Sequence, residues 1–157
     1  MDLAFFTRKA GVKIILLESC TGGLASAWIT SLNGSSSWFE GGLITYSNFM
    51  KKFFLKVNEE DIQTHGAVSR KVAKEMAVAL LKEPFLNIVT ASITGLAGPI
   101  GGSKKKPIGL VYFSWAGPWG VDTKSKIFKG SRQQIREQAA LYSLTFLTKK
   151  IAAVKQF

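Results

Sequence analysis

Two nucleophilic side chains stand next to each other near the start of the chain, Ser19 and Cys20 in the stretch ESCTGG. Gly22 and Gly23 allow the backbone to approach a ligand closely. With Thr21 they precede an expected helix, whose first N–H groups favour negative charge. The stretch is neither a GxxxxGK(S/T) phosphate loop nor a GxSxG nucleophile elbow. It therefore predicts either a nucleophile beside an anion or oxyanion site, or a structural turn with a capping serine.

A serine nucleophile needs a base, and the stretch TYSNFMKK offers Tyr46 and Lys51. A lysine can accept the serine proton when burial or neighbouring cations lower its pKa, and a tyrosine between the two could relay the proton. Cys20 would need a base as well. The alternative is an ordinary solvated lysine and a tyrosine at an interface. The residues alone leave both interpretations open.

A glycine-rich loop, ITGLAGPIGG at residues 93–102, follows an apolar run that predicts a buried strand. Its candidate ligand-binding positions are Thr94, Gly95, Gly98, Gly101 and Gly102. Consecutive backbone N–H groups in such a loop can bind an anion or an oxyanion, and the Thr94 hydroxyl adds a further hydrogen-bonding group. The alternative is an ordinary surface loop.

Further along the chain, Arg132 and Arg136 are four residues apart and therefore share one face of an expected helix. Two guanidinium groups in this arrangement can hold a phosphate, although a solvated helix face has the same pattern. His65 is the one histidine and Cys20 the one cysteine, which excludes a Cys/His zinc cluster. We therefore expect no metal site, and we expect His65 to cap or turn the chain rather than to act in catalysis.

The pattern of apolar residues predicts the elements that must position these side chains. The predicted strands are Val12–Leu17, Phe39–Tyr46 with a close backbone approach at its glycines, Leu86–Thr94, Ile108–Trp115 and an edge strand at Thr123–Lys129. The predicted helices are Leu24–Leu32, a short one within Phe49–Val57, Ser69–Lys82 capped by Ser69 and followed by Pro84, and Gln133–Val154. Strands and helices alternate early and two strands follow each other late, which favours an α/β sandwich with a mixed sheet.

The chain has 157 residues, which suits one domain spanning residues 1–157. Its net charge is +11, from 21 Lys and Arg against 10 Asp and Glu, which favours anionic partners such as a phosphorylated small molecule or nucleic acid. No apolar run approaches the roughly 20 residues that span a bilayer, and the N-terminal charges follow the apolar patch, the wrong order for a secretory signal. A single cysteine fits a reducing cytoplasm. We therefore expect a cytoplasmic protein without a membrane partner.

Six segments, taken together and in this order, resemble the CinA C-terminal domain family. They are ESCTGG, GSSSWFEGGLITYSN followed by Lys51, HGAVS, TGLAGPIGG, KPIG and FKGSRQQIR. They span residues 18–136, and the ordered set is more specific than any one segment. The resemblance implies a three-layer α/β/α sandwich with a mixed sheet. Full-length CinA proteins also have an N-terminal nucleotide-binding domain, so at this length the chain resembles the stand-alone form.

The resemblance also implies an activity, hydrolysis of the carboxamide of nicotinamide mononucleotide to nicotinate mononucleotide and ammonia. The implied catalytic residues are Ser19 as the nucleophile and Tyr46 and Lys51 as its helpers, with no metal and no cofactor. Two departures from the family pattern are Ser131 and the pair Lys104-Lys105, where a Pro-Glu pair is common. These departures bear on substrate affinity and loop conformation rather than on the chemistry.

The remaining residues that the resemblance implies belong to substrate binding. Thr94 and the glycine loop after it match the family's substrate-binding loop. Arg132 or Arg136 matches an arginine on the phosphate side of the substrate, and the motif does not decide which of the two it is.

A different class of function is a non-catalytic nucleotide- or DNA-binding module, which the net charge and the family's link with competence suggest. No recognisable nucleic-acid motif is present, and aromatic residues do not interleave with the basic ones, so nucleic acid is the less favoured partner. The presence of Ser19, Tyr46 and Lys51 favours an enzyme over an inactive relative. Because apolar helices on small α/β domains often pair, we also expect a homo-oligomer.

Overall fold

The apolar runs at residues 13–18 and 88–95 form two parallel central strands, β1 (Lys13–Glu18) and β3 (Ile88–Gly95). The computed structural model describes residues 2–81 and 87–154, and within them the sheet has the strand order β2-β1-β3-β4-β5. β2 (Phe39–Ile44) is parallel to β1, whereas β4 (Leu110–Gly117) and β5 (Gly120–Ile127) are antiparallel to their neighbours. The predicted mixed sheet is confirmed.

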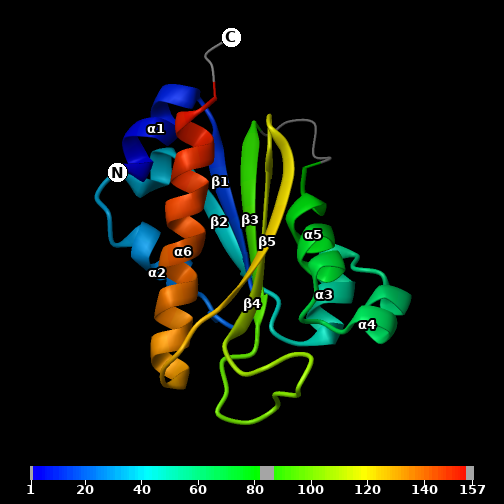
Figure 1. The fold of residues 1–157 in the computed structure, drawn as a ribbon. Coiled ribbons are helices and arrows are strands. Elements are labelled where there is room, and N and C mark those ends of the chain that lie inside the picture. The colour runs from blue at the N-terminus through cyan, green and yellow to red at the C-terminus, as the bar shows by residue number, and fades with distance from the viewer. Residues whose placement is uncertain (1, 82–86, 155–157) are drawn as a thin grey trace.

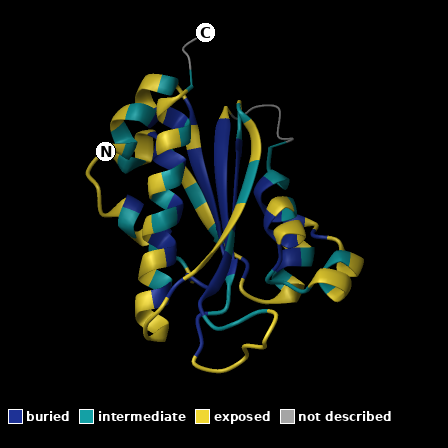
Figure 2. Cartoon of the chain, in the orientation of Figure 1, coloured by how far each residue is buried: buried dark blue, intermediate teal, exposed yellow. Residues whose placement is uncertain are grey.

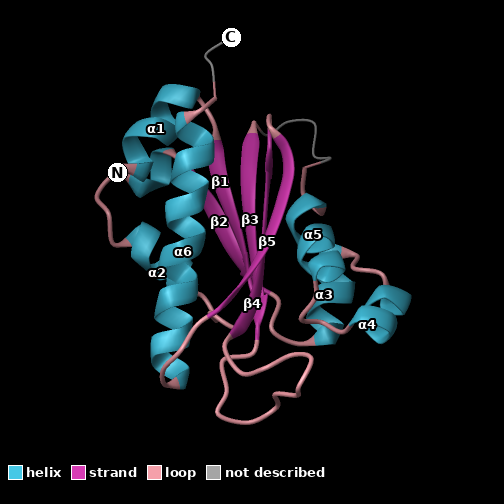
Figure 3. Ribbon diagram, viewed as in Figure 1, coloured by secondary structure: helices cyan, strands magenta, loops and turns pink. Residues whose placement is uncertain are grey.

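Helices cover both faces of this sheet and so make three layers (Figure 1, Figure 3). On one face lie α1 (Leu3–Ala10), α2 (Leu24–Thr30) and the long α6 (Arg132–Ala152). On the other face lie α3 (Asn48–Leu55), α4 (Glu59–His65) and α5 (Arg70–Val78). A short 3-10 helix, η1 (Ser35–Ser37), lies in the polar stretch between α2 and β2. The expected α/β/α sandwich is confirmed.

The apolar character of β1 follows from its position between two helical layers. Ile14 and Leu16 pack into the hydrophobic cluster with α1, α2 and α6, whereas Ile15 and Leu17 pack into the cluster with α3 and α5. Successive side chains of a strand point to opposite faces, so a strand covered on both faces must be apolar throughout. The edge strand β5 is mostly exposed, in contrast to the dark central strands of Figure 2. The predicted edge strand is confirmed.

Serine side chains begin three of the helices. The hydroxyls of Ser47, Ser69 and Ser131 accept hydrogen bonds from backbone N–H groups in the first turns of α3, α5 and α6. The predicted cap at Ser69 is therefore confirmed. At α6 the Gln134 side chain also accepts from the Ser131 amide at 2.8 Å, which completes a capping box. Ser131, a departure from the family pattern, thus has a structural role at the start of α6.

The strand β2 ends earlier than the sequence pattern predicts. Its last paired residue is Ile44, and Thr45 and Tyr46 leave the sheet toward α3. Within the strand, Gly42 lies against α2, where a Cβ atom would come within 2.1 Å of the Ser26 hydroxyl oxygen. The predicted close approach of the backbone at a glycine is confirmed here.

Two helices, α1 and α4, were not predicted. α1 is held by its ends, because the Asp2 carboxylate accepts from the Phe5 amide and Gly11 ends the helix in a left-handed conformation with φ 65°. α4 has seven mostly polar residues and packs mainly through Ile62. Both segments are too short to show a helical repeat of apolar residues. Their capping residues are therefore the sequence feature that indicates these helices.

The remaining difference concerns the connection between α5 and β3. The sequence predicts a helix to Lys82, and the ordered α-helical hydrogen bonding ends at Val78. The predicted helix end at Lys82, Pro84 after it and the predicted strand start at Leu86 lie outside the described residues.

Candidate active site

Ser19 is the first residue after β1, at the point where two parallel strands end. Its amide donates to the Ile93 carbonyl of β3 at 2.9 Å, so the backbone at Ser19 is still held by the sheet. The carboxyl ends of parallel strands are where ligands gather in open α/β sheets. The side chain is 7% exposed, which leaves the hydroxyl oxygen at the base of a small cleft.

Lys51 reaches this hydroxyl from α3. Its Nζ lies 2.9 Å from Ser19 Oγ, 2.9 Å from the Thr45 carbonyl oxygen and 3.0 Å from the Tyr46 carbonyl oxygen. The two carbonyls can only accept hydrogen bonds. A neutral amine at this position therefore donates its two N–H groups to Thr45 and Tyr46, and its lone pair is left for the Ser19 proton.

Burial sets the protonation of both groups next to Ser19. Lys51 is 1% exposed and has no carboxylate partner among the described residues, so loss of hydration lowers its pKa from 10.5 to about 8. About a tenth of the amine is then neutral at pH 7. Burial raises the pKa of the Cys20 thiol from 9.0 to about 12, so Cys20 remains protonated and packs in the core. Of the two adjacent nucleophiles, Ser19 is the one that contacts an amine.

Tyr46 lines the same cleft, and the hydrogen bond of its side chain is made to Arg132 rather than to this pair. Its ring is 58% exposed, and its hydroxyl accepts a hydrogen bond from Arg132 Nη2 at 3.0 Å. The contacts of Tyr46 with Lys51 and Ser19 Oγ are made by its backbone carbonyl oxygen, at 3.0 and 3.5 Å. The serine and the lysine touch directly, so a proton can pass between them without a tyrosine relay.

Glu18 is a residue of this site that the sequence analysis did not single out. Its carboxylate is fully buried and accepts hydrogen bonds from the amides of Gly23, Ala25 and Ser26 and from the Ser26 hydroxyl, at 2.7–3.3 Å. It thereby binds the positive N-terminal end of α2. An acidic residue at the end of an apolar strand, just before a helix, is the signal that could have indicated this role.

Glu18 also determines what Thr21–Gly23 do. The Gly23 amide is taken by Glu18 and the Gly22 amide donates to the Ser19 carbonyl at 3.0 Å. The Thr21 side chain is fully buried. These three residues form the turn into α2 and do not line the cleft. The structure places them as a support that holds Ser19 in position.

The two arginines of α6 lie in different places. Arg136 donates to the carbonyl oxygens of Cys20 and Thr21, at 3.1 and 2.8 Å, and so ties α6 to the turn after β1. Arg132 lines the cleft and donates to the Gly98 carbonyl at 2.7 Å as well as to Tyr46. Arg132 is exposed at the mouth of the cleft, where a charged group of a ligand can reach it.

The cleft beside Ser19 and Lys51 has a volume of about 220 Å³. Its walls come from four segments: the residues after β2, the segment at 67–68, the start of the glycine-rich loop and Arg132 at the start of α6. The stretches ESCTGG, TYSNFMKK and the glycine-rich loop, which the sequence analysis singled out, therefore meet at this cleft.

A family model described as the CinA C-terminal domain matches residues 2–151. The chain belongs to the CinA C-terminal domain family. Among solved structures, a CinA superfamily protein from Klebsiella pneumoniae superposes with a TM-score of 0.90 at 28% identity, covering 97% of this chain and 94% of that one.

Curated relatives fall into two lengths. A nicotinamide-nucleotide amidohydrolase PncC from Enterobacter agglomerans is 47% identical over 145 residues, covering 92% of this chain and 88% of that protein. The PncC protein of Escherichia coli K12 is 44% identical over 141 residues, covering 89% of this chain and 85% of that protein. A CinA-like protein from Desulfotalea psychrophila is 46% identical over 139 residues, but the chain spans only 33% of its length.

In this CinA domain the glycine-rich loop contributes only its first part to the cleft. Thr94, Gly95 and Ala97 line it, and the Thr94 hydroxyl donates to the Ala67 carbonyl at 2.9 Å. Gly98 meets Arg132 through its carbonyl. Gly101 and Gly102 are exposed and lie outside the cleft lining.

The other expectations on the CinA domain concern metal, membrane and His65. In residues 2–81 and 87–154, no group of three or more His, Cys, Asp or Glu is arranged to hold a metal ion. Within the same ranges, no helix combines the length and apolar character needed to cross a bilayer. His65 is the last residue of α4, its carbonyl accepts from Lys106, and it does not line the cleft.

Proposed function

We propose that this chain is a nicotinamide-nucleotide amidase, which hydrolyses the carboxamide of nicotinamide mononucleotide to nicotinate mononucleotide and ammonia. The observation that carries the proposal is the direct contact, at 2.9 Å, between Ser19 Oγ and the buried amine of Lys51. A serine with an adjacent base of lowered pKa is the arrangement of a nucleophile in acyl transfer. The relatives named as amidohydrolases support the substrate.

In the proposed reaction, Ser19 Oγ attacks the carboxamide carbon while its proton passes to neutral Lys51. The tetrahedral intermediate collapses as the C–N bond breaks, and Lys51 returns the proton to the departing nitrogen, which leaves as ammonia. Water then attacks the acyl-enzyme while losing a proton to Lys51. As this second tetrahedral intermediate collapses, the bond between the acyl carbon and Ser19 Oγ breaks, Lys51 returns its proton to Ser19 Oγ, and the carboxylic acid leaves. The atoms of one amide and one water thus give one carboxylic acid and one ammonia.

The oxyanion needs a hydrogen-bond donor beside the cleft. The amides of Gly22 and Gly23 are already used in the turn before α2. Ala97 lines the cleft, and its amide donates no hydrogen bond to another described residue. We assign this amide as an oxyanion donor.

The size of the cleft suggests how the substrate lies. A volume of about 220 Å³ is below the roughly 300–1,000 Å³ of sites that enclose a whole drug-sized ligand. The nicotinamide ring with its carboxamide enters the cleft, and the ribose phosphate remains at the mouth. Arg132 at the mouth is then the phosphate-side arginine.

The proposal includes three further expectations. Residues 1–157 act as one amidohydrolase domain, without metal or cofactor. The protein works in the cytoplasm, where a free thiol such as that of Cys20 persists. The protein also forms a homo-oligomer. The exposed apolar side chains of β2 and α3 offer a surface for this assembly. On α3 the rings of Phe49 and Phe53 are stacked, with their centroids 5.6 Å apart. Light scattering measures the assembly directly.

Ammonia release from nicotinamide mononucleotide tests the proposal. We expect the wild type to release ammonia and Ser19→Ala to lose more than about 10³-fold in kcat, because the nucleophile is removed. Cys20→Ala, a change at the adjacent residue, is the matched control and should retain most of the activity. Equal release by wild type and Ser19→Ala would exclude Ser19 as the nucleophile. No release by either protein would reject the amidase itself.

A further inference from the structure

A second cavity lies on the other side of the segment 66–69 from the proposed active site. Ala67 and Val68 line the cleft with Ser19, whereas His65 and Ser69 line this second cavity. Its volume is about 530 Å³, within the roughly 300–1,000 Å³ range of sites for small molecules. The proposed amidase reaction does not use it.

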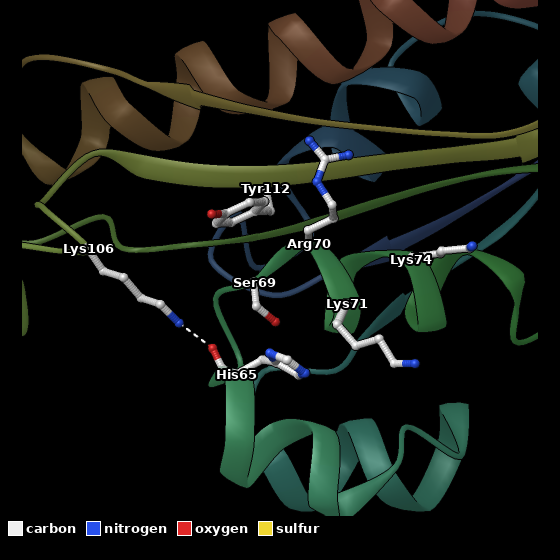
Figure 4. Close-up of a pocket in the computed structure, with 7 residues that line it drawn as sticks. All are labelled: His65, Ser69, Arg70, Lys71, Lys74, Lys106 and Tyr112. Carbon is white, nitrogen blue, oxygen red and sulfur yellow. Dashed lines mark hydrogen bonds between the residues drawn. The ribbon is translucent and has the colours of Figure 1, made fainter.

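The lining of this cavity is rich in cations. Arg70, Lys71 and Lys74 extend along α5, Lys106 reaches in from the segment before β4, and no carboxylate is among the residues that line it (Figure 4). We call this the basic cavity. A concave surface with charges of one sign concentrates ligands of the opposite sign.

Within residues 2–81 and 87–154, three of the four cations have no carboxylate partner. Lys71 lies 3.5 Å from Asp61 and 3.9 Å from Glu75, so its charge is shared with acidic neighbours. Arg70 donates to the Thr123 carbonyl at 2.7 Å, and Lys106 donates to the His65 carbonyl. Lys74 has no ion-pair or hydrogen-bond partner in the described part of the chain. Carbonyl oxygens accept hydrogen bonds but leave the positive charge in place.

An aromatic side chain completes the wall of the basic cavity. Tyr112 comes from β4 and is half-buried. Figure 4 shows its ring on the strand side, between Lys106 and Arg70. An aromatic ring next to cations offers a face on which a heterocyclic base can stack, and stacking of this kind accepts any base.

We propose that the basic cavity binds a nucleoside polyphosphate at a site separate from the amidase cleft. A single phosphate monoester carries a charge of about −1.5 to −2 at neutral pH, which is less than three uncompensated positive charges. Two or three linked phosphates match the cations better, and Tyr112 adds a place for the base. Its volume of about 530 Å³ is that of a small-molecule site, which favours a small molecule over a nucleic-acid strand.

Calorimetric titration with ATP tests this site, using the Ser19→Ala chain so that nicotinamide mononucleotide can be present without turnover. We expect ATP to bind and the double variant Arg70→Gln/Lys74→Gln to weaken binding by about tenfold, because two charge-assisted contacts are lost at a partly exposed site. The matched control is Lys129→Gln/Lys149→Gln, which removes the same charge outside the cavity. It should leave the affinity within about twofold, since distant exposed charges are screened.

Four further results would overturn the assignment. Equal weakening in both double variants would mean that ATP responds to net charge alone. Displacement of ATP by saturating nicotinamide mononucleotide would place it in the amidase cleft. Binding of inorganic tripolyphosphate as tight as that of ATP would remove the role of the nucleoside. If a single-stranded oligonucleotide binds at the cavity and ATP does not, the site is a nucleic-acid surface. Each readout is binding, so it stands apart from whether the chain hydrolyses an amide.

Discussion

Lys51 and Lys74 lie on neighbouring helices of the same layer, yet their surroundings differ in almost every respect. Lys51 on α3 is 1% exposed and contacts a serine hydroxyl and two carbonyls. Lys74 on α5 is exposed to water and faces a cavity lined by other cations. The same side chain is therefore suited to two kinds of work, proton transfer in one place and charge attraction in the other.

Hydration is what separates the two roles. An ammonium group removed from water loses its hydration energy, so its pKa falls and it can act as a base near neutral pH. A lysine that keeps its water keeps its charge, and it attracts anions through that charge without exchanging the proton. The segment 66–69 thus lies between the proposed catalytic site and the proposed anion site.

The most direct way to break this comparison is to remove each amine in turn. Lys51→Met should lower kcat for nicotinamide mononucleotide by about 10³-fold, within the 10²–10⁴ range that general bases contribute. Lys74→Met, the same change on the other lysine, should leave kcat within about twofold, because hydrated surface charges contribute little at a distance. The measurement is steady-state ammonia release by both variants. Circular dichroism should show that both remain folded, since Met fills the volume of Lys51 with an apolar chain.

Equal losses of activity in Lys51→Met and Lys74→Met would contradict the assignment of Lys51 as a base and of Lys74 as a hydrated charge. They would mean that Lys51 acts through general charge, as Lys74 does, and that another group takes the Ser19 proton. Lys51→Arg sharpens the same test, because arginine keeps the charge and cannot act as a base. We expect Lys51→Arg to be as inactive as Lys51→Met.

Arg132 is a cation of the amidase cleft that resembles those of the basic cavity, since it is exposed and available to a ligand anion. Arg132→Gln should raise KM for nicotinamide mononucleotide by about tenfold or somewhat more, the value of a charge-assisted contact to phosphate, with little change in kcat. Nicotinamide riboside, which lacks the phosphate, is the matched substrate. Its kcat/KM should not respond to the same variant.

Arg136→Gln is the matched variant for this prediction. Arg136 binds the carbonyls of Cys20 and Thr21 rather than lining the cleft, so its loss should lower thermal stability instead of raising KM selectively. A phosphate-specific rise of KM in Arg136→Gln, with none in Arg132→Gln, would exchange the roles of the two arginines.

Much of this fold was predictable from the sequence because long apolar patterns carry it. The apolar run Val12–Leu17 predicts a buried strand, and the pattern at 133–154 predicts the long helix α6. The short helices α1 and α4 depend on single capping side chains, Asp2 and Asn58, which a periodic pattern does not detect. The early end of β2 goes with the hydrogen bonds that the carbonyls of Thr45 and Tyr46 accept from Lys51 in the helix that follows, which an apolar pattern does not detect.

The candidate site was predictable in its residue types but not in its contacts. Ser19 and Lys51 are 32 positions apart in the sequence, and their meeting depends on how α3 packs against the end of β1. Which arginine faces the cleft depends on how α6 is rotated about its axis. The spacing of four residues shows only that the two arginines share a helix face, and it does not determine that rotation. Glu18 was overlooked because its role needs the turn at 21–23 to bring the start of α2 back over the strand end.

The smallest predicted effect is a dependence of stability on pH that only the buried lysine should cause. The pKa of Lys51 is about 8 in the folded chain and 10.5 when solvated, so between these values the unfolded chain binds a proton that the folded chain does not. Stability therefore rises with pH across this window, by about 1 kcal/mol between pH 7 and pH 9. Cys20 acts in the opposite direction above pH 9, because its folded pKa of about 12 exceeds the ordinary 9.0.

Urea denaturation of the wild type, Lys51→Met and Lys74→Met at pH 7 and pH 9 isolates this effect. At pH 7 the free energy of unfolding of Lys51→Met should gain relative to wild type, because the variant does not bury an ammonium group. This gain should shrink or reverse as the pH rises, because the cost of burying the ammonium group disappears when Lys51 is neutral. The difference between wild type and Lys74→Met should not change with pH, since Lys74 is hydrated in both states. The same slope in both comparisons would show that burial does not set the protonation of Lys51, and the distinction between the two lysines would then have to rest on position alone.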